Sequence, residues 1–203
     1  MSPEALAAGD PLLARAIAEV GPPDQRFTRP KGFTGLLRMI VEQQLSTRVA
    51  EVLWAKLEAR VPDIHPAAFL ALDDETLRAC GFSRQKQVYG RALAEAVTAG
   101  ALDFDRLETL DDDAAAAELV RLKGIGRWTA EIYLMGALGR ADVFPADDLA
   151  LQIGVQQLAG WETRPKPKQL LERAEAWRPH RSLAAEIIWR HYETKRRKGP
   201  ASK

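Results

Sequence analysis

The chain has 203 residues, of which 46% are apolar, so it is long enough to bury a real core as one globular unit, with room for two lobes. Its formal net charge is +1, from 29 basic and 28 acidic residues, so the total charge gives no support to nucleic-acid binding. The single cysteine, Cys80, excludes an internal disulfide and an iron–sulfur cluster, which needs about four thiolates. We therefore expect a reducing, cytoplasmic location.

Two further classes are disfavoured by the chain's pattern. Residues 1–20 carry acids among apolar side chains and lack a basic segment, so we expect no signal or transit peptide, and no apolar run is long enough to cross a bilayer. The histidines lack metal-ligand spacing, so we expect surface or helix-terminal positions and no catalytic metal; they are His65, His180 and His191.

Helical spacing of apolar residues recurs from end to end, and no stretch alternates strictly between apolar and polar residues. The predicted fold is therefore all-α. The first helix is expected over 11–20 and a loop over 24–32. The next helix should bury Leu36, Leu37, Ile40 and Val41. Ser46 is then predicted to cap a helix whose buried face is Val49, Val52, Leu53 and Leu57.

The second half of the chain continues the helical pattern. Acidic triplets at 73–75 and 111–113 precede Ala/Leu-rich segments, and we interpret them as caps that stabilise the positive end of a helix dipole. Further helices are predicted over 84–99, 114–121, 129–138, 149–158, 169–177 and 182–195. The basic run Lys195 to Lys198, within a tail over 195–203, is predicted to be frayed and flexible.

A glycine turn, Gly124-Ile125-Gly126, joins the helices predicted over 114–121 and 129–138. Glycine lacks a Cβ, so a partner can approach the main chain, and the helix that follows offers free N–H groups to an anion such as phosphate. Arg127 adds a positive charge there. A tight hairpin between helices can also use such a turn for structural reasons alone.

A carboxylate pair, Asp147-Asp148, stands where the chain enters the helix over 149–158, just after Pro145. On physical grounds alone the pair is best explained as a helix cap, worth about 1 kcal/mol. A capping carboxylate is also held ionised by the helix dipole, and it could stabilise a cation such as the oxocarbenium-like sugar of glycosidic cleavage.

Three segments resemble the helix-hairpin-helix (HhH-GPD) DNA glycosylases, specifically the bacterial and fungal 3-methyladenine glycosylases of the AlkA/Mag type. They are IVEQQLS over 40–46, the stretch 122–152, which includes LKGIGRWTAEIYL and DVFPADDLALQ, and WRPHRSLAAEIIW over 177–189. The resemblance implies a two-lobed helical fold with the active-site cleft between the lobes, formed by a single domain over 1–203 with its hairpin at about 114–138. The chain departs from the larger relatives in one respect: because helical signals start near Pro11, we expect their β-rich amino-terminal domain to be absent.

The resemblance assigns roles to individual residues. The catalytic aspartate is Asp148, with Asp147 as the fallback. Base-pocket positions are Trp128, Trp189 and, beside Ile132, Tyr133. The DNA-binding positions are Gln43, Gln44, Leu45, Ser46, Gly124, Gly126, Arg127 and Thr129, with one of Gln43, Gln44 and Leu45 as the wedge that fills the hole left by a flipped nucleotide. Backbone carbonyls of Val120, Leu122 and Ile125 match a monovalent-cation site.

The implied function is excision of alkylated bases, such as 3-methyladenine and 7-methylguanine, from double-stranded DNA by a monomer that needs no cofactor. Trp128 stands where relatives with lyase activity carry a nucleophilic lysine, so a monofunctional hydrolase is implied. Two alternatives stay open at this point. One is a non-catalytic hairpin module that only binds DNA, and the other is a mismatch or other-lesion glycosylase of the same superfamily.

Overall fold

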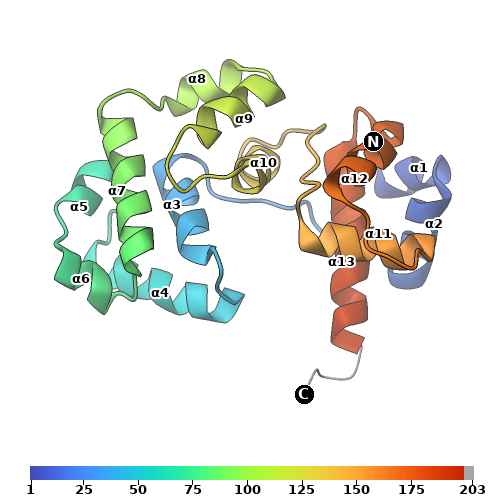
Figure 1. The fold of residues 1–203 in the computed structure, drawn as a ribbon, viewed down its shortest axis with the longest axis horizontal. Coiled ribbons are helices and arrows are strands. Elements are labelled where there is room, and N and C mark those ends of the chain that lie inside the picture. Colours follow the sequence, from blue (N-terminus) through green and yellow to red (C-terminus); the bar gives the residue numbers. More distant parts are fainter. Residues whose placement is uncertain (199–203) are drawn as a thin grey trace. The chain divides into compact units, whose positions relative to one another are not determined.

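The computed structural model describes the backbone of residues 1–198 and the side chains of residues 1–197. Over that range the chain forms helices α1 to α13 and a short 3₁₀ segment, with no β-strand, which confirms the all-α prediction (Figure 1). It divides into two compact units. We call residues 1–28 with those from Gly139 onward the terminal unit, and residues 29–138 the central unit.

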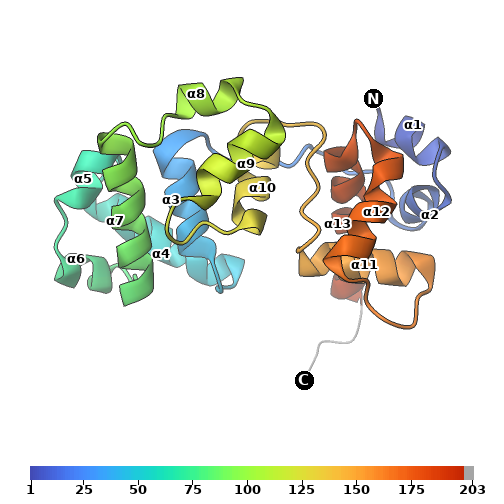
Figure 2. The ribbon, with the colours of Figure 1, turned by 45° about the horizontal axis from the view of Figure 1, so that its top comes forward.

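The terminal unit joins the two ends of the chain. Figures 1 and 2 show the first two helices beside the last three. The long α13 packs against α2 and α11, and its residues Leu183, Ile187 and Ile188 are buried as predicted. The bounds are α1 (Pro3–Ala8), α2 (Pro11–Val20), α11 (Leu149–Ala159), α12 (Pro167–Ala174), η1 (Glu175–Trp177) and α13 (Arg181–Lys198).

The central unit is built around α7, which packs against α3 and α5. Gly90 allows this approach, since a Cβ there would lie 2.7 Å from the Phe69 ring. In α10 every residue from Thr129 to Gly136 is buried, as its apolar sequence predicts. The bounds are α3 (Gly32–Glu42), α4 (Thr47–Arg60), α5 (Pro66–Leu70), α6 (Asp74–Ala79), α7 (Arg84–Thr98), α8 (Phe104–Thr109), α9 (Asp112–Val120) and α10 (Arg127–Gly136).

The acidic triplets act as predicted at the helix starts. Asp73 accepts a hydrogen bond from the Thr76 N–H at 2.7 Å, and Asp111 accepts one from the Ala114 N–H at 2.8 Å. Three short helices, α1, α5 and α8, were not predicted, and α1 begins well before the expected first helix. With five or six residues each, they are too short to display a helical period.

Three other predictions are wrong. Helix α4 buries Leu57 as predicted, but the rest of its buried face is Ala50 and Trp54, while Val49 and Val52 are exposed. His191 is buried, although His65 does cap α5. Residues 195–198 belong to α13 and Lys195 pairs with Glu19, so this part of the basic tail is helical; residues 199–203 lie outside the described residues.

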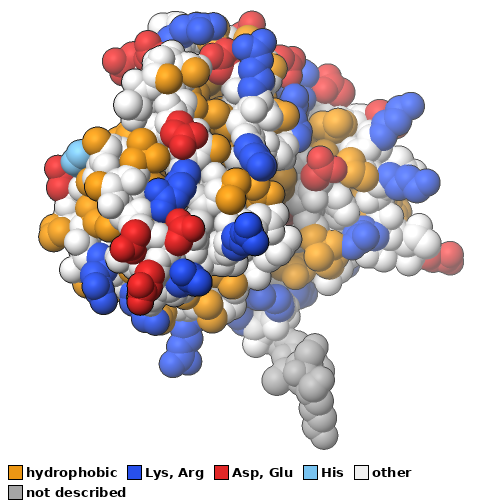
Figure 3. Space-filling model, turned by 60° about the vertical axis from the view of Figure 1, so that its left-hand side comes forward, with side chains coloured by type: hydrophobic (Ala, Val, Ile, Leu, Met, Phe, Trp, Pro, Cys, Tyr) orange, Lys and Arg blue, Asp and Glu red, His pale blue; other side chains and the backbone are white. Residues whose placement is uncertain are grey.

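None of the helices described is long and apolar enough to cross a membrane. On the face that Figure 3 brings forward, basic and acidic side chains are interspersed with apolar ones, in keeping with the near-zero net charge. Recognition of a charged partner must therefore depend on local geometry.

Candidate active site

The hairpin between α9 and α10 uses its two glycines for different purposes. Gly124 has a φ of 93°, and a Cβ there would lie 2.2 Å from Cγ of Tyr89 on α7, so this glycine lets the turn pack onto the scaffold. Gly126 has an ordinary φ of −89° and precedes α10 as its N-cap, without a capping side chain. A Cβ at Gly126 would meet no heavy atom within 4 Å. The N-terminus of α10 is therefore open to an anion at Gly126.

Arg127 faces acids of its own chain. Its Nε lies 2.7 Å from Glu131 Oε1 and its Nη2 lies 3.3 Å from Asp113 Oδ1, so the side chain braces α10 against α9. These contacts, led by the hydrogen bond with Glu131, raise the pKa of Arg127. Its charge is thus compensated locally, and the expected extra cation for a phosphate is already paired.

The loop over 43–46 is fixed to the hairpin by Gln43. The Gln43 amide donates to the Gly124 carbonyl at 2.9 Å and lies 3.5 Å from Thr129 Oγ1. Lys86 Nζ donates to the main-chain carbonyls of Ile40 at 3.1 Å and Gln43 at 2.6 Å, and burial lowers the pKa of Lys86. The structure therefore brings together the predicted residues Gln43, Gly124 and Thr129, with Lys86 as an unpredicted anchor.

Gln44 is held in a conformation that non-glycine residues rarely adopt. Its φ is 58° and its side chain is exposed. Ser46 caps α4 as predicted, with its hydroxyl 3.4 Å from the Val49 N–H. Strained backbone of this kind is concentrated at sites of function.

A hollow of about 400 Å³ lies next to this loop. Trp128 is part of its wall and is 39% exposed, so it is not a core tryptophan. The complete lining is Arg29, Met39, Glu42, Gln43, Gln44, Leu45, Trp128, Thr129 and Ile132. Four of the predicted DNA-binding or base-pocket positions thus meet with Trp128 at one depression of the central unit.

Tyr133 does not belong to this hollow. It is fully buried, and its hydroxyl accepts a hydrogen bond from the Gly32 N–H at 2.8 Å. Burial raises the pKa of Tyr133 to about 12. The prediction that Tyr133 lines a base pocket is corrected: helical geometry turns it into the core and leaves its neighbour Ile132 in the wall.

Asp148 stands at the start of α11 in the terminal unit. Its Oδ1 accepts hydrogen bonds from the Leu151 N–H at 2.9 Å and from the indole Nε1 of Trp189 at 3.0 Å. The preceding loop is fixed by Gln152, whose amide donates to the Ala146 carbonyl at 2.8 Å. Asp147 is exposed and caps nothing, which singles out Asp148. The predicted cap is confirmed, and Trp189 is an additional donor to it.

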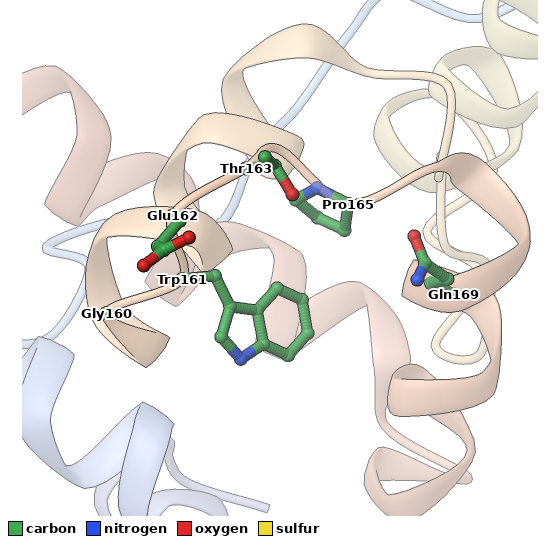
Figure 4. A pocket seen from close by; sticks show the side chains of 6 residues that line it. All are labelled: Gly160, Trp161, Glu162, Thr163, Pro165 and Gln169. Atoms are coloured by element: carbon green, nitrogen blue, oxygen red, sulfur yellow. The ribbon is translucent and has the colours of Figure 1, made fainter.

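A second depression, of about 480 Å³, lies at the loop between α11 and α12 (Figure 4). The Trp161 indole, the Pro165 ring and the Gln169 amide lie around it. It contains none of the predicted site residues.

Metal ligation by side chains has no candidate in the described part of the chain. No group of three or more His, Cys, Asp or Glu residues there could hold an ion. The predicted monovalent-cation site uses main-chain oxygens instead. Val120 ends α9, where carbonyls carry the negative end of the helix dipole, and the Leu122 carbonyl turns to accept from the Ile125 N–H at 3.0 Å. Neutral main-chain oxygens at a helix C-terminus suit a small hard cation.

Comparison with known proteins identifies relatives along most of the chain. Residues 37–179 match the family described as HhH-GPD superfamily base excision DNA repair protein. DNA-3-methyladenine glycosylase 1 of Schizosaccharomyces pombe is 30% identical over 174 residues, which are 83% of this chain and 75% of the relative.

Solved structures of relatives have the same fold. A DNA-3-methyladenine glycosidase of Bacillus halodurans is 35% identical with a TM-score of 0.82, covering 94% of this chain and 88% of that one. An S. pombe 3-methyladenine DNA glycosylase in complex with abasic DNA is 28% identical with a TM-score of 0.84, covering 99% and 98%.

Proposed function

The chain belongs to the HhH-GPD superfamily of base excision DNA repair proteins, and from that premise we propose that it is a monofunctional DNA glycosylase that removes alkylated bases from duplex DNA. The observation that carries the proposal is the carboxylate of Asp148, which caps α11 and accepts a hydrogen bond from the indole N–H of Trp189. Relatives named as 3-methyladenine glycosylases support the substrate class, and the solved relative in complex with abasic DNA supports DNA as the partner.

The reaction is hydrolysis of the N-glycosidic bond. As this bond breaks, its electron pair leaves with the base and positive charge develops on the sugar, where the Asp148 carboxylate stabilises it. Water then adds to C1′ and gives its proton to Asp148, which acts as the general base. The products are the free base and an abasic site. A lysine nucleophile would be needed for lyase chemistry, and Trp128 occupies the matching position.

Alkylated purines suit this reaction because their ring carries positive charge. Cleavage then releases a neutral base, so a strong general acid is not required. The electron-rich face of Trp128, exposed at the hollow of the central unit, favours a cationic ring by cation–π attraction. A damaged base also flips out of the duplex at a smaller free-energy cost, on the order of a few kcal/mol.

The hairpin and the 43–46 loop grip the DNA. Gly126 offers the N-terminus of α10 to a phosphate. The carbonyls of Val120, Leu122 and Ile125 would hold a monovalent cation, which would supply positive charge for that phosphate. Gln44 is the wedge, because it is exposed and strained, whereas the Gln43 amide is occupied by Gly124. The protein acts as a monomer on the DNA of the cytoplasm.

The direct test is base release from a duplex that contains 7-methylguanine, under single-turnover conditions with protein in excess. We expect free 7-methylguanine and an alkali-sensitive abasic site, with no strand cleavage before alkali. A matched duplex carrying a mismatched but undamaged adenine is the control and should stay intact. Binding of both duplexes without release of any base would identify a DNA-binding module instead.

A further inference from the structure

The indole of Trp189 lies between the Asp148 carboxylate and a second aromatic ring. Trp189 Nε1 is 3.0 Å from Asp148 Oδ1. Its ring packs against Phe27, with centroids 5.4 Å apart and planes tilted by 56°. Trp189 is partly exposed, and Asp148 already caps α11 through the Leu151 N–H, so the cap itself does not need Trp189.

Phe27 is held in place by a buried carboxylate. It belongs to the non-helical segment that follows α2, and its backbone N–H is hydrogen-bonded to Glu186. Arg26 completes the attachment, with Nε 3.0 Å from Glu186 Oε1 and 2.9 Å from Oε2. Glu186 lies on α13 one turn before Trp189. Glu186 therefore fixes the Arg26–Phe27 segment, and this segment carries the Phe27 ring that packs on Trp189.

Glu186 is an unusual choice for a structural position. Its side chain is 5% exposed, and burial, opposed by Arg26, raises its pKa. Removing a carboxylate from water is costly, and replacing a buried ion pair by well-packed apolar side chains of similar volume often leaves stability unchanged or raises it. A charged side chain at position 186 is explained if the Arg26–Glu186 ion pair fixes the position of the Arg26–Phe27 segment.

We propose that Phe27, Arg26 and Glu186 form a positioning group that holds the Trp189 indole N–H against Asp148, so that Trp189 orients the carboxylate as well as meeting the base. The proposal rests on the proposed function of Asp148. Rotation about the terminal bond of an aspartate is only weakly restricted, so one donor on Oδ1 leaves the plane of the carboxylate loosely defined. A second donor from a side chain that is itself held fixes it.

The test separates orientation of charge from base stacking. Two duplexes are compared as ligands: one carries a pyrrolidine abasic analogue, whose protonated ring nitrogen imitates the sugar cation, and the other carries neutral tetrahydrofuran at the same position. The ratio of their affinities reports how well Asp148 meets a positive charge, and neither ligand has a base for Trp189 to stack on. Wild type should prefer the cationic duplex, and Asp148→Asn should abolish the preference.

Trp189→Phe removes the indole N–H but keeps an aromatic face, and Phe27→Leu and Glu186→Gln loosen the positioning group. We expect each to lower the cation preference and to slow single-turnover release of 7-methylguanine by about 10- to 100-fold, with the protein concentration for half-maximal rate unchanged. Trp177→Phe is the matched control, because it also removes an indole–carboxylate hydrogen bond, 2.8 Å from Nε1 to Asp10 Oδ2. It should leave the cation preference intact, although folding weakens.

Three outcomes would reject the positioning group. Wild-type cation preference and rate in Trp189→Phe, or in both Phe27→Leu and Glu186→Gln, overturn the positioning group while leaving the proposed function standing. A wild type with neither base release nor cation preference overturns the proposed function itself, and the positioning group with it. Loss of cation preference in Trp177→Phe as well would show that general weakening of the terminal unit, rather than orientation, is responsible, and this also rejects the proposal.

Discussion

Neighbouring glutamines of the 43–46 loop have separate tasks at the scale of single residues. The Gln43 side chain is held at the hairpin by its hydrogen bond to the Gly124 carbonyl, while Gln44 is exposed with a φ of 58°. A strained, exposed residue beside a hollow is suited to insertion into DNA. The sequence QQ identifies the loop but does not distinguish the two side chains, since that depends on where Gly124 lies.

Replacing Gln44 should separate stability from activity. Glycine accepts a positive φ that alanine does not, so we expect Gln44→Gly to be more stable than Gln44→Ala by about 1 kcal/mol. Both variants lack the wedge side chain and should release 7-methylguanine more slowly than wild type. Urea unfolding measures the first difference and single-turnover kinetics the second. Equal stability of the two variants would argue against strain at this position.

A cap by Asp147 or Asp148 could be predicted from the residues alone, because Pro145 ends one segment and an apolar helix follows at once, whereas the choice of Asp148 came from the resemblance. The contact of Asp148 with Trp189 could not be predicted, since the two residues are joined only by the packing of α13 on α11. Phe27 gave no signal at all. An aromatic residue in a loop has no period or motif, and only its contact with Trp189 gives it a role.

At the scale of elements, the hairpin was predicted correctly but its glycines were treated as equivalent. The structure separates them by their surroundings, Tyr89 for Gly124 and open space for Gly126. In helix α4 the sequence offered two faces with helical spacing, and the wrong one was predicted to be buried. The predicted face Val49, Val52, Leu53 and Leu57 has helical spacing, and so has Ala50, Trp54 and Leu57. The bulk of Trp54, which needs burial, decides which face turns inward.

The two glycines should respond differently to the same substitution. Gly124→Ala places a Cβ against Tyr89 at a positive φ, so we expect a loss of about 1–3 kcal/mol in the free energy of unfolding. Gly126→Ala has neither problem and should cost less, about 1 kcal/mol or below for replacing a glycine N-cap by alanine, while its methyl group obstructs a phosphate and weakens DNA binding. Thermal unfolding and a binding titration measure both effects. Full DNA affinity in a stable Gly126→Ala protein would contradict the proposal that a phosphate binds at this turn.

For the whole molecule, the terminal unit depends on contacts between the two ends of the chain. Buried His191 on α13 lies 3.2 Å from Glu19 on α2, and Lys195 and Arg15 bind the same carboxylate. Burial, only partly opposed by Glu19, lowers the pKa of His191. Hydrogen bonds from Lys195, Arg15 and His191 lower the pKa of Glu19 to about 2. The sequence predicted both helices, but not which acid would meet which base.

These shifts make the terminal unit sensitive to acid. The unfolded chain takes up a proton at His191 near the ordinary pKa of 6.5, which the folded chain resists, so the free energy of unfolding falls as the pH drops below 6.5. Glu19 adds a further loss between its ordinary pKa of 4.5 and about 2. We expect His191→Leu to flatten the decline just below pH 6.5, measured by urea unfolding at several pH values. An unchanged slope would mean that His191 does not titrate differently in the two states.

The proposed glycosylase activity depends on Asp148. Asn replaces Asp148 conservatively, because Asn caps a helix as well as Asp does. The decisive measurement is single-turnover release of 7-methylguanine by Asp148→Asn, with Asp147→Asn as the matched control. We predict that Asp148→Asn lowers the rate by at least about 100-fold while unfolding and DNA affinity stay close to wild type, and that Asp147→Asn keeps full activity. Wild-type release by a folded Asp148→Asn protein would contradict the account.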